Sequence, residues 1–204
     1  MKNHQRFRTF LAEFTRLVDL HGKEESVLLE QGSRLLAQLV GHDDWLPDES
    51  ARADAKHYQQ YLLHCDALER FSVVSFVWSA GQRTPVHDHC VWGMVGVLRG
   101  AETCRRFVRA APGEPLNVSD SYRLEVGMVD VLSPRAGDIH EVSNALADRP
   151  SISIHVYGAN IGATHRHVYE PETGIERPFV SGYANALIPN FWDRSEAVRS
   201  TLGK

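Results

Sequence analysis

A series of short β-strand candidates, separated by turn signals, dominates the chain from about Lys56 onward. The clearest is residues 71–78, FSVVSFVW, which is rich in β-branched and aromatic residues. Turns containing glycine or proline separate successive candidates, as at Gly100 and Gly113. Many short strands at regular spacing are typical of a β-sandwich or a small barrel. We therefore predict a mainly β fold, a small β-barrel or jelly roll.

The predicted strands cover residues 58–64, 71–78, 89–98, 102–108, 121–124, 129–132, 141–144, 151–157 and 165–169.

Two amphipathic α-helices are predicted ahead of the strands. Apolar residues recur at three- and four-residue steps over residues 7–20 and again over residues 26–40. The segment 43–54 is predicted to be a loop held in place by Trp45 and Pro47. These N-terminal helices are expected to cover one face or one end of the barrel.

The chain is predicted to form a single domain with three parts. Its 204 residues are enough for one sizeable core. Residues 1–55 form the helical preface, residues 56–170 the barrel, and residues 171–204 a C-terminal tail packed on the barrel. The tail residues expected to mark this packing are Pro178, Pro189, Phe191 and Trp192.

Charge and cysteine content exclude several classes of protein. A net charge of -4 offers no basic surface for nucleic acid or an anionic membrane. The N-terminus lacks the apolar stretch of a signal peptide, and no apolar run is long enough to span a membrane. Three widely spaced cysteines without a CxxC pair argue against a disulfide framework and a structural zinc site. We expect a cytoplasmic protein, monomeric or weakly oligomeric.

His87 and His89, in the sequence TPVHDHC, are separated by a single residue. Alternate residues of a β-strand point to the same face, so the two imidazoles can converge on one point. Such a pair beside the apolar run Val91–Leu98 can be part of a metal site. It can equally pack as two ordinary core residues, and the pair alone leaves both interpretations open.

His140, in the sequence SPRAGDIHEVSN, is the third candidate metal ligand. Gly137, three residues earlier, suits a tight turn that delivers His140 onto a strand. Together with the first histidine pair, this segment resembles the two sequence motifs of the cupins, over roughly residues 75–160. The motif residues are Gly81, His87, Asp88, His89, Gly93 and Gly100 in the first motif and Gly127, Pro134, Gly137, His140 and Asn144 in the second, with small departures in spacing.

Gly93 stands where many cupins carry a glutamate as a fourth metal ligand. The site therefore offers three neutral imidazoles and no carboxylate. A divalent ion would keep its full positive charge there, together with open positions that favour an anionic ligand such as a thiolate. The more common oxygenase arrangement has two histidines and one carboxylate. Three histidines suit zinc with a bound water as well as iron, and the ligand set leaves that choice open.

Ser153, His155 and Tyr157 alternate with the aliphatic residues Ile154 and Val156. On a strand, the three polar side chains share one face. Inside a barrel such a face is costly unless its groups bond one another, which a serine, a neutral histidine and a tyrosine can do. The same alternation also fits a strand whose polar face meets solvent.

The combination of TPVHDH, Gly93, GDIHEVSN and SISIHVYG resembles the thiol dioxygenases, the cysteine dioxygenase family of cupins. Within that family, the chain is most similar to the bacterial 3-mercaptopropionate dioxygenases. The resemblance covers most of the chain, including YQQYLLHC at the start of the barrel and ATHRHVYEP near its end. It implies a non-haem Fe(II) enzyme that adds both atoms of dioxygen to the sulfur of a small thiol carboxylate, converting 3-mercaptopropionate to 3-sulfinopropionate.

The resemblance also implies roles for individual residues. The iron ligands match His87, His89 and His140. The active-site tyrosine matches Tyr157, with His155 and Ser153 behind it as a hydrogen-bonded relay. In mammalian-type enzymes a cysteine crosslinks to this tyrosine, but the matching residue here is Gly93, so no such cofactor is expected. Cys90 should face away from Gly93.

The substrate carboxylate is expected to bind Arg166. Mammalian-type enzymes use an arginine on the early strand, where this chain has Gln60, and the resemblance to the mercaptopropionate branch transfers the role to Arg166. A guanidinium can bind a carboxylate through two charge-assisted hydrogen bonds, whereas Gln60 offers only neutral amide contacts and is expected to assist. Without the resemblance, Arg166 would fit a surface salt bridge with Glu170 or Asp193.

The remaining histidines are expected to be structural or exposed. They are His165 and His167, which flank Arg166, and His4, His21, His42, His57 and His64.

Other functions remain open from the sequence. The same centre could oxidise cysteine, mercaptosuccinate or cysteamine instead, or could belong to a zinc or nickel hydrolase or isomerase. A cupin that senses a metal or small ligand without turnover is a further alternative. The N-terminal helices show neither a basic recognition face nor a helix-turn-helix signature to support such a regulator.

Overall fold

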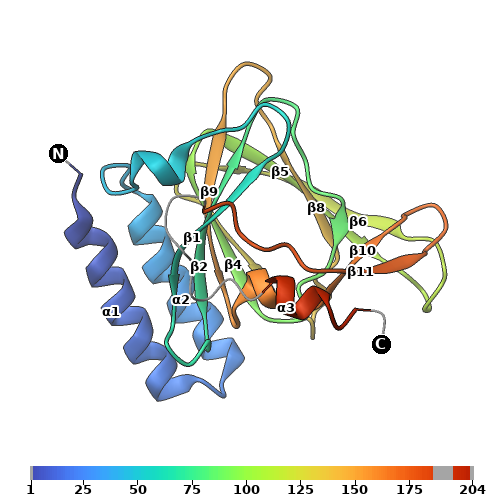
Figure 1. Cartoon of the computed structure of the whole chain (residues 1–204), viewed down its shortest axis with the longest axis horizontal. Helices are drawn as coiled ribbons and strands as arrows, with labels where there is room; N and C mark the ends of the chain where they lie inside the picture. Colours follow the sequence, from blue (N-terminus) through green and yellow to red (C-terminus); the bar gives the residue numbers. More distant parts are fainter. Residues whose placement is uncertain (1, 186–194, 203–204) are drawn as a thin grey trace.

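The computed structural model describes residues 2–185 and 195–202. Within these ranges, two N-terminal helices lie against a β-barrel built from two antiparallel sheets (Figure 1). The predicted fold class, a mainly β barrel with N-terminal α-helices, is confirmed.

The helices are α1 His4–His21, α2 Glu25–Val40 and α3 Ser195–Arg199, with 3-10 turns η1 Asp48–Ala51 and η2 Ile161–Ala163. The strands are β1 Gln59–Cys65, β2 Ser72–Trp78, β3 Val86–His87, β4 Gly93–Arg99, β5 Ala101–Val108, β6 Asn117–Glu125, β7 Val129–Leu132, β8 His140–Asn144, β9 Ser151–Tyr157, β10 Arg166–Tyr169 and β11 Glu176–Phe179.

Both sheets pair strands that are far apart in the sequence. The first has the order β1-β2-β9-β4-β7 and the second the order β11-β10-β3-β8-β5-β6. In the first sheet β9 lies between β2 and β4, so Tyr157 pairs with Ser72 on one side and Gly93 on the other. In the second sheet β3 lies between β10 and β8, and His87 pairs directly with His140. These pairings bring the two cupin-like segments together.

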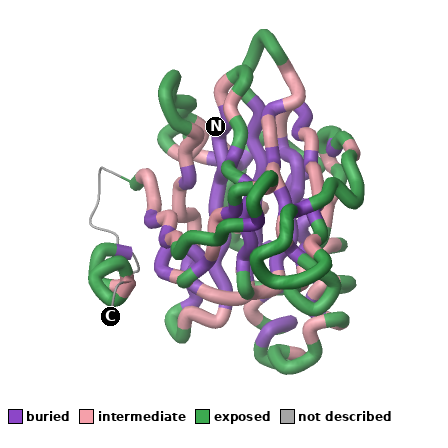
Figure 2. Tube along the Cα trace, turned by 90° about the vertical axis from the view of Figure 1, so that its right-hand side faces the viewer, coloured by how far each residue is buried: buried purple, intermediate pink, exposed green. Residues whose placement is uncertain are grey.

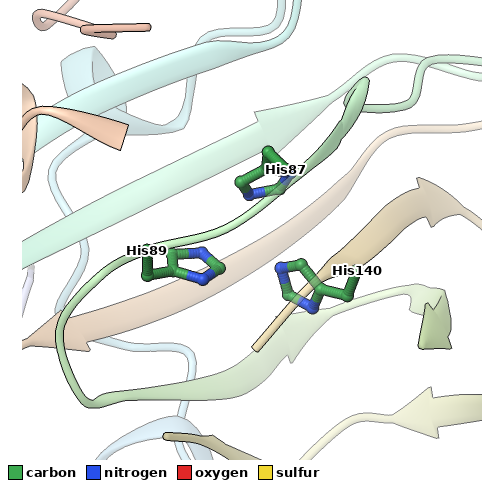
Figure 3. A group of neighbouring side chains, drawn as sticks. All are labelled: His87, His89 and His140. Atoms are coloured by element: carbon green, nitrogen blue, oxygen red, sulfur yellow. The ribbon is translucent and has the colours of Figure 1, made fainter. Parts of the chain in front are cut away.

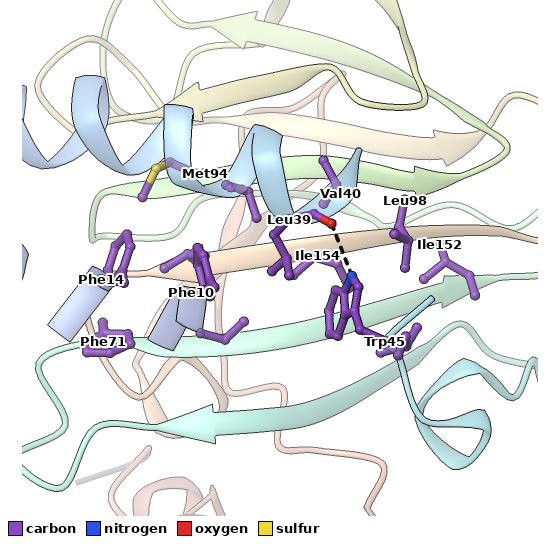
Figure 4. Packing of buried hydrophobic residues seen from close by; sticks show 14 of the residues in the cluster. Phe10, Phe14, Leu39, Val40, Trp45, Phe71, Met94, Leu98, Ile152 and Ile154 are labelled. Carbon is purple, nitrogen blue, oxygen red and sulfur yellow. Dashed lines mark hydrogen bonds between the residues drawn. The ribbon is translucent and has the colours of Figure 1, made fainter. Parts of the chain in front are cut away.

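The helices cover the outer face of the first sheet. Phe14 of α1 and Val40 of α2 are fully buried against this face, together with Ile154 of β9 (Figure 4). A side chain at Gly96 would meet Leu36 at 3.0 Å, so the glycine permits the close approach of α2 to β4. The indole of Trp45 donates to the Leu39 carbonyl at 3.2 Å and anchors the segment after α2, as predicted.

A second apolar cluster fills part of the space between the two sheets. It includes Phe76 and Trp78 of β2, Val95 of β4 and Val142 of β8, next to Tyr157. Figure 2 shows that buried residues concentrate along the central strands, whereas the connecting loops are exposed. The barrel interior is therefore partly apolar and partly polar, and its polar part holds the candidate site.

The predicted strand over residues 89–98 is wrong at its start. Strand β3 ends at His87, and the next strand begins only at Gly93. Between them the backbone turns at Cys90, whose φ of 58° lies in the left-handed region. The amide groups of His89 and Cys90 both donate to the Asp138 carboxylate, at 2.8 and 3.1 Å, which replaces strand pairing in this loop.

The described part of the C-terminal segment contacts the barrel. Strand β11, which the sequence did not predict and which contains Pro178, pairs with β10. Beyond it, the amide of Gly182 donates to the Gly162 carbonyl at 2.9 Å and that of Ala184 to the Gln60 carbonyl at 2.8 Å. The tail residues Pro189, Phe191 and Trp192 lie outside the described residues.

None of the helices within the described ranges has the length and hydropathy required to cross a lipid bilayer.

Candidate metal centre

Three buried histidines converge inside the barrel. His87 ends β3 and His140 begins β8, and their direct pairing sets these two rings side by side. His89 follows from the loop after β3. All three ring-to-ring distances are 4.8 Å, and one nitrogen of each ring lies within 4.8 Å of those of the other two. Figure 3 shows the rings directed toward one another.

The hydrogen bonds of these rings leave nitrogens available to a metal. His87 Nδ1 lies 3.0 Å from the Pro85 carbonyl, which can only accept, so Nδ1 carries the proton and Nε2 is free. His140 Nδ1 lies 3.6 Å from the Cys104 sulfur. Both nitrogens of His89 are buried without a hydrogen-bond partner among the described residues. Since a buried orphaned nitrogen is costly, a metal ligand is the fitting role for His89.

The electrostatics keep all three imidazoles neutral. Burial, and then the charge of Arg166, lower the pKa of His87 to about 4. Burial and the neighbouring histidines hold the pKa values of His89 and His140 well below the usual range. Neutral imidazole is the form that binds metal ions. The three histidines can therefore hold a divalent metal ion.

The carboxylates of Asp138 and Asp88 position the loop that carries His89. Asp138, from the GDIH segment, accepts both loop amides described above. Asp88 accepts from the amide and ring Nδ1 of His167, each at 2.8 Å, and from the Tyr169 hydroxyl at 2.7 Å. Asp88 thereby ties the histidine loop to β10, and His167 has the structural role that was predicted.

Asp88, Cys90 and His167 also form a second group of potential ligand atoms within 4.8 Å of one another. The Asp88 oxygens, however, already accept hydrogen bonds from three donors. Burial raises the pKa of the Cys90 thiol to about 12, and the nearby Asp88 charge adds to the effect. Because the Asp88 carboxylate is engaged by three donors and the Cys90 thiol is neutral, this group acts as a structural clamp.

The polar face of β9 forms the predicted chain of hydrogen bonds. Ser153 Oγ lies 2.7 Å from His155 Nε2, and His155 Nδ1 lies 2.7 Å from the Tyr157 hydroxyl. All three residues are buried, which excludes the alternative of a solvent-facing strand. Burial lowers the pKa of His155 to about 3, so its ring is neutral and can accept at one nitrogen while donating at the other.

Tyr157 connects this chain to the three histidines. Its ring stacks on His89, with 5.2 Å between ring centres. Burial raises the pKa of its hydroxyl well above the usual range, so the group keeps its proton. A Cβ at Gly93 would lie 2.9 Å from the Tyr157 ring, too close without a shift. Gly93 thus makes room for the tyrosine, and the exposed Cys90 lies with Asp88 instead.

Arg166 is buried near the histidines, with only 3% of its surface exposed. One of its terminal nitrogens donates to Ser181 Oγ at 2.8 Å, and its guanidinium lies 5.0 Å from the centre of the Phe179 ring. Its Nε has no partner, and no carboxylate of the described residues pairs with it. Glu170 pairs with Arg177 instead. Asp193, the other partner considered from the sequence, lies outside the described residues.

Gln60 lies beside Arg166 but is already engaged. Its amide nitrogen donates to Ser181 Oγ at 3.1 Å and to the Gly182 carbonyl at 3.0 Å. Ser181 therefore bridges Gln60 and Arg166. The contact of Gln60 with a substrate stays a prediction, and only its carbonyl oxygen is left to make it.

Several residues of the site were not singled out from the sequence. Cys104 contacts His140, Asp138 holds the His89 loop, and Ser181 contacts Arg166. A further acidic residue, Glu102, is fully buried at the inner end of the β9 chain. The sequence showed only an acidic residue at the start of the predicted strand 102–108, soon after Gly100. For such a residue an exposed position was the simpler interpretation.

No family model matches the chain. Solved structures of similar backbone include an uncharacterized conserved protein with a double-stranded beta-helix domain from Klebsiella pneumoniae, at 18% identity over 55% of this chain and 80% of that one, with a TM-score of 0.45. An RmlC-like cupin protein from Desulfovibrio desulfuricans is 23% identical over 57% and 94% of the two chains, with a TM-score of 0.39. A DMSP lyase from Ruegeria pomeroyi is 18% identical over 62% and 60%, with a TM-score of 0.43. At these levels of similarity, none of them carries its function over to this chain.

Proposed function

We propose that this protein is a non-haem Fe(II) thiol dioxygenase that oxidises a small thiol carboxylate, 3-mercaptopropionate, to its sulfinate. The observation that carries the proposal is a buried arginine that no carboxylate of the described residues pairs with, beside three converging neutral imidazoles. The sequence resemblance to the thiol dioxygenases agrees with this pairing. A ligand with a thiol at one end and a carboxylate at the other requires two partners, a metal centre and a separate cationic group.

Free ring nitrogens of His87, His89 and His140 would hold the iron. When bound, a ferrous ion of this kind supplies a redox-active Lewis acid that accepts an anionic sulfur and reacts with dioxygen. Since all three protein ligands are neutral, the negative charge of a thiolate would be favoured at this site. The Cys104 sulfur orients His140 and the Pro85 carbonyl orients His87. Contacts of this kind to the outer nitrogen of a ligand histidine are common in metal sites.

The overall reaction balances without a further reductant. A thiolate and one dioxygen molecule give one sulfinate, with both oxygen atoms on sulfur and the thiol proton released. This is the thiol-to-sulfinate oxidation known for cysteine side chains, here applied to a free small molecule. The protein contributes positioning and the exclusion of water.

Arg166 would bind the substrate carboxylate. Its Nε is buried and has no partner within residues 2–185 and 195–202, and Ser181 and Phe179 hold the guanidinium in place. A buried cation without an anion is costly, so a carboxylate that enters would be bound strongly. Gln60 would support this pocket through Ser181, and would reach the substrate only through its carbonyl oxygen.

Tyr157 would donate a hydrogen bond to the substrate carboxylate or to dioxygen on the side facing the three histidines. Its hydroxyl is held by His155, and His155 in turn by Ser153. Because the pKa of the hydroxyl is raised, Tyr157 stays a donor throughout the physiological range. The fixed position of this hydroxyl is the contribution that the buried chain makes.

Oxygen uptake tests the proposal directly. Protein loaded with ferrous iron should consume one dioxygen for each 3-mercaptopropionate and yield the sulfinate, identified by mass. A panel that includes cysteine, cysteamine and mercaptosuccinate, compared by kcat/KM, fixes the substrate. Metal analysis of protein purified without added metal separates iron from zinc or nickel. Absence of oxygen uptake with every thiol, at full iron loading, would refute the dioxygenase and favour a non-catalytic binding protein.

A further inference from the structure

Glu102 is a buried acid that the function proposed above leaves without a role. It lies on β5 and has none of its surface exposed. Neither carboxyl oxygen has a hydrogen-bond partner among the described residues, and the Ser151 hydroxyl nearby is likewise buried and unpaired. Buried carboxyl oxygens are rarely left without a partner, because a lost hydrogen bond leaves their desolvation uncompensated. This residue therefore needs an explanation.

The polar groups that face Glu102 belong to the chain on β9. Gly100 packs against Ser151, so β5 begins next to the start of β9. The side chains that act on the carboxyl are Ser153, Trp78 and Ser151, in that order. All three lie close enough to lower the pKa of the carboxyl, Ser153 most, but none has the geometry of a full hydrogen bond to it. Ser153 Oγ also accepts from the Trp78 indole N–H at 3.4 Å. Ser153 is thus the point where Glu102 meets the chain.

The chain from Ser153 to Tyr157 can run in two directions, because His155 is neutral and carries one ring proton. In the first, Ser153 donates to Nε2 and Nδ1–H donates to Tyr157, whose own hydrogen points into the metal site. In the second, Nε2–H donates to Ser153 and Tyr157 donates to Nδ1, so its hydrogen points away. The distances fit both directions. A group at the free end of Ser153 decides between them.

We propose that Glu102 ends this chain and acts as a proton store whose charge sets the direction in which Tyr157 donates. A protonated carboxyl donates to Ser153 and selects the first direction. An ionised carboxylate accepts from Ser153 and selects the second. Glu102 is a positioning residue in this scheme, because it acts on the metal site only through the chain.

The exchange between the two states conserves protons. The Glu102 O–H bond breaks and its proton passes to Ser153, while the Ser153 proton passes to His155 Nε2. The Nδ1 proton of His155 then passes to Tyr157, and the original Tyr157 proton leaves to an acceptor in the metal site. The net change is the loss of one proton to that acceptor: Glu102 becomes ionised, His155 changes its tautomer, and Ser153 and Tyr157 each regain the proton that they passed on. The reverse sequence takes up one proton from the site.

The surroundings place this exchange near neutral pH. Burial raises the pKa of Glu102 to about 8, and Ser153, Trp78 and Ser151 offset only part of the effect. On the neighbouring strands its register partners are Asn144 of β8 and Leu124 of β6, neither of which titrates.

The titratable groups of the facing strand are His155 and Tyr157. His155, whose pKa is about 3, does not titrate near pH 8. Tyr157 keeps its proton there because its pKa is raised. Any change of the chain near pH 8 is therefore assigned to Glu102.

The ring proton of His155 reports the switch without any turnover. Nitrogen NMR of histidine-labelled protein, with paramagnetic metal removed by a chelator, distinguishes Nδ1–H from Nε2–H, and a His155→Gln sample assigns the signal. We expect the proton on Nδ1 below pH 8 and on Nε2 above it. In Glu102→Gln the tautomer should stay the same across this range. A wild-type tautomer that does not change, or a change that persists in Glu102→Gln, would overturn the proposal.

Two further measurements keep the test decisive. Infrared spectroscopy should show the carbonyl band of a protonated carboxylic acid in the native protein, lost as the pH rises through about 8. In Ser153→Ala the carboxylic acid band should still disappear over the same pH range, but the His155 tautomer should no longer change with pH. As the matched control, Glu125→Gln alters an exposed acid on β6 and should leave both signals unchanged. These readouts do not depend on the substrate, so failure of the dioxygenase assay leaves them valid.

Discussion

The two faces of strand β9 divide the molecule into two different interiors. On one face, Ile152, Ile154 and Val156 pack beneath α1 and α2 in a cluster made only of hydrophobic residues. On the other, the polar side chains from Ser153 to Tyr157 point between the two sheets, toward the three histidines. Both faces are fully buried, so burial alone does not distinguish them.

The difference lies in how the polar groups are satisfied. In the helix-side cluster the indole N–H of Trp45 is paired with the Leu39 carbonyl, and close packing of the apolar side chains stabilises the fold. The barrel-side interior holds atoms of His89, Glu102 and Arg166 that have no hydrogen-bond partner within the described ranges. Such groups reduce stability and are expected where a ligand, a metal or a proton completes them. Substitutions on the two faces should therefore fail in different ways.

His140→Ala should have the largest effect on the barrel side. Removal of one of three ligands is expected to abolish metal retention, because two neutral imidazoles leave the ion bound weakly. Metal analysis after gel filtration measures this loss. His57→Ala, an exposed histidine outside the triad, is the control and should retain the metal. Full metal occupancy in His140→Ala would remove this residue from the ligand set.

Phe14→Ala should have the next largest effect, and on stability alone. Phe14 is fully buried and packs against Phe10 and Phe71, with ring centres 5.6 and 5.0 Å away. Truncating a buried phenylalanine costs about 3–5 kcal/mol. The denaturant midpoint should fall accordingly, while metal bound per folded molecule stays at the wild-type value. If metal binding fell in the folded protein, the two interiors would not be independent.

Much of this division was predicted from periodicity. The apolar spacing of the N-terminal segments predicted both helices, and the alternation over residues 151–157 predicted which side chains of β9 share a face. These features depend on local repeats. His89 was expected on a strand, but the loop that carries it is shaped by Asp138, some fifty residues later in the chain.

The residues that escaped prediction depend on contacts between distant segments. Strand β11 forms because β10 offers it an edge, and its sequence ERPF has little strand character of its own. Glu102 and Cys104 alternate with Thr103 and Arg105 on β5, a pattern that also fits a half-exposed strand. Only the pairing of β5 with β8 and its approach to β9 place these two side chains inside the barrel.

Arg166→Met should separate function from stability on the barrel side. Loss of charge-assisted hydrogen bonds to a carboxylate corresponds to about 1.5–3 kcal/mol, or roughly ten- to a hundredfold in KM for the thiol carboxylate. The denaturant midpoint should not fall, because methionine fills similar space and removes a buried cation that has no carboxylate partner among the described residues.

Gln60→Ala provides the comparison, since its amide already bonds Ser181 and Gly182. It should raise KM less than Arg166→Met does. The reverse order would reassign the carboxylate contact. A fall of several kcal/mol in the stability of Arg166→Met would show that the arginine serves the fold instead.

Cys104→Ala should have the smallest effect, because Cys104 acts on the metal only through His140. The Cys104 sulfur lies 3.6 Å from His140 Nδ1, and burial raises the pKa of the thiol to about 11, so it is a neutral and weak partner. Removing a group that contacts a metal ligand typically lowers metal affinity about 10–100-fold. Because the sulfur contact is weak, the loss of affinity in Cys104→Ala should be near tenfold. Competition with a chelator measures the change, and Cys104→Ser, which keeps a polar partner of similar size, should recover most of it. Equal losses of metal affinity in both variants would mean that the sulfur supports His140 by packing. At this position the barrel side would then be held by apolar packing, as the helix side is.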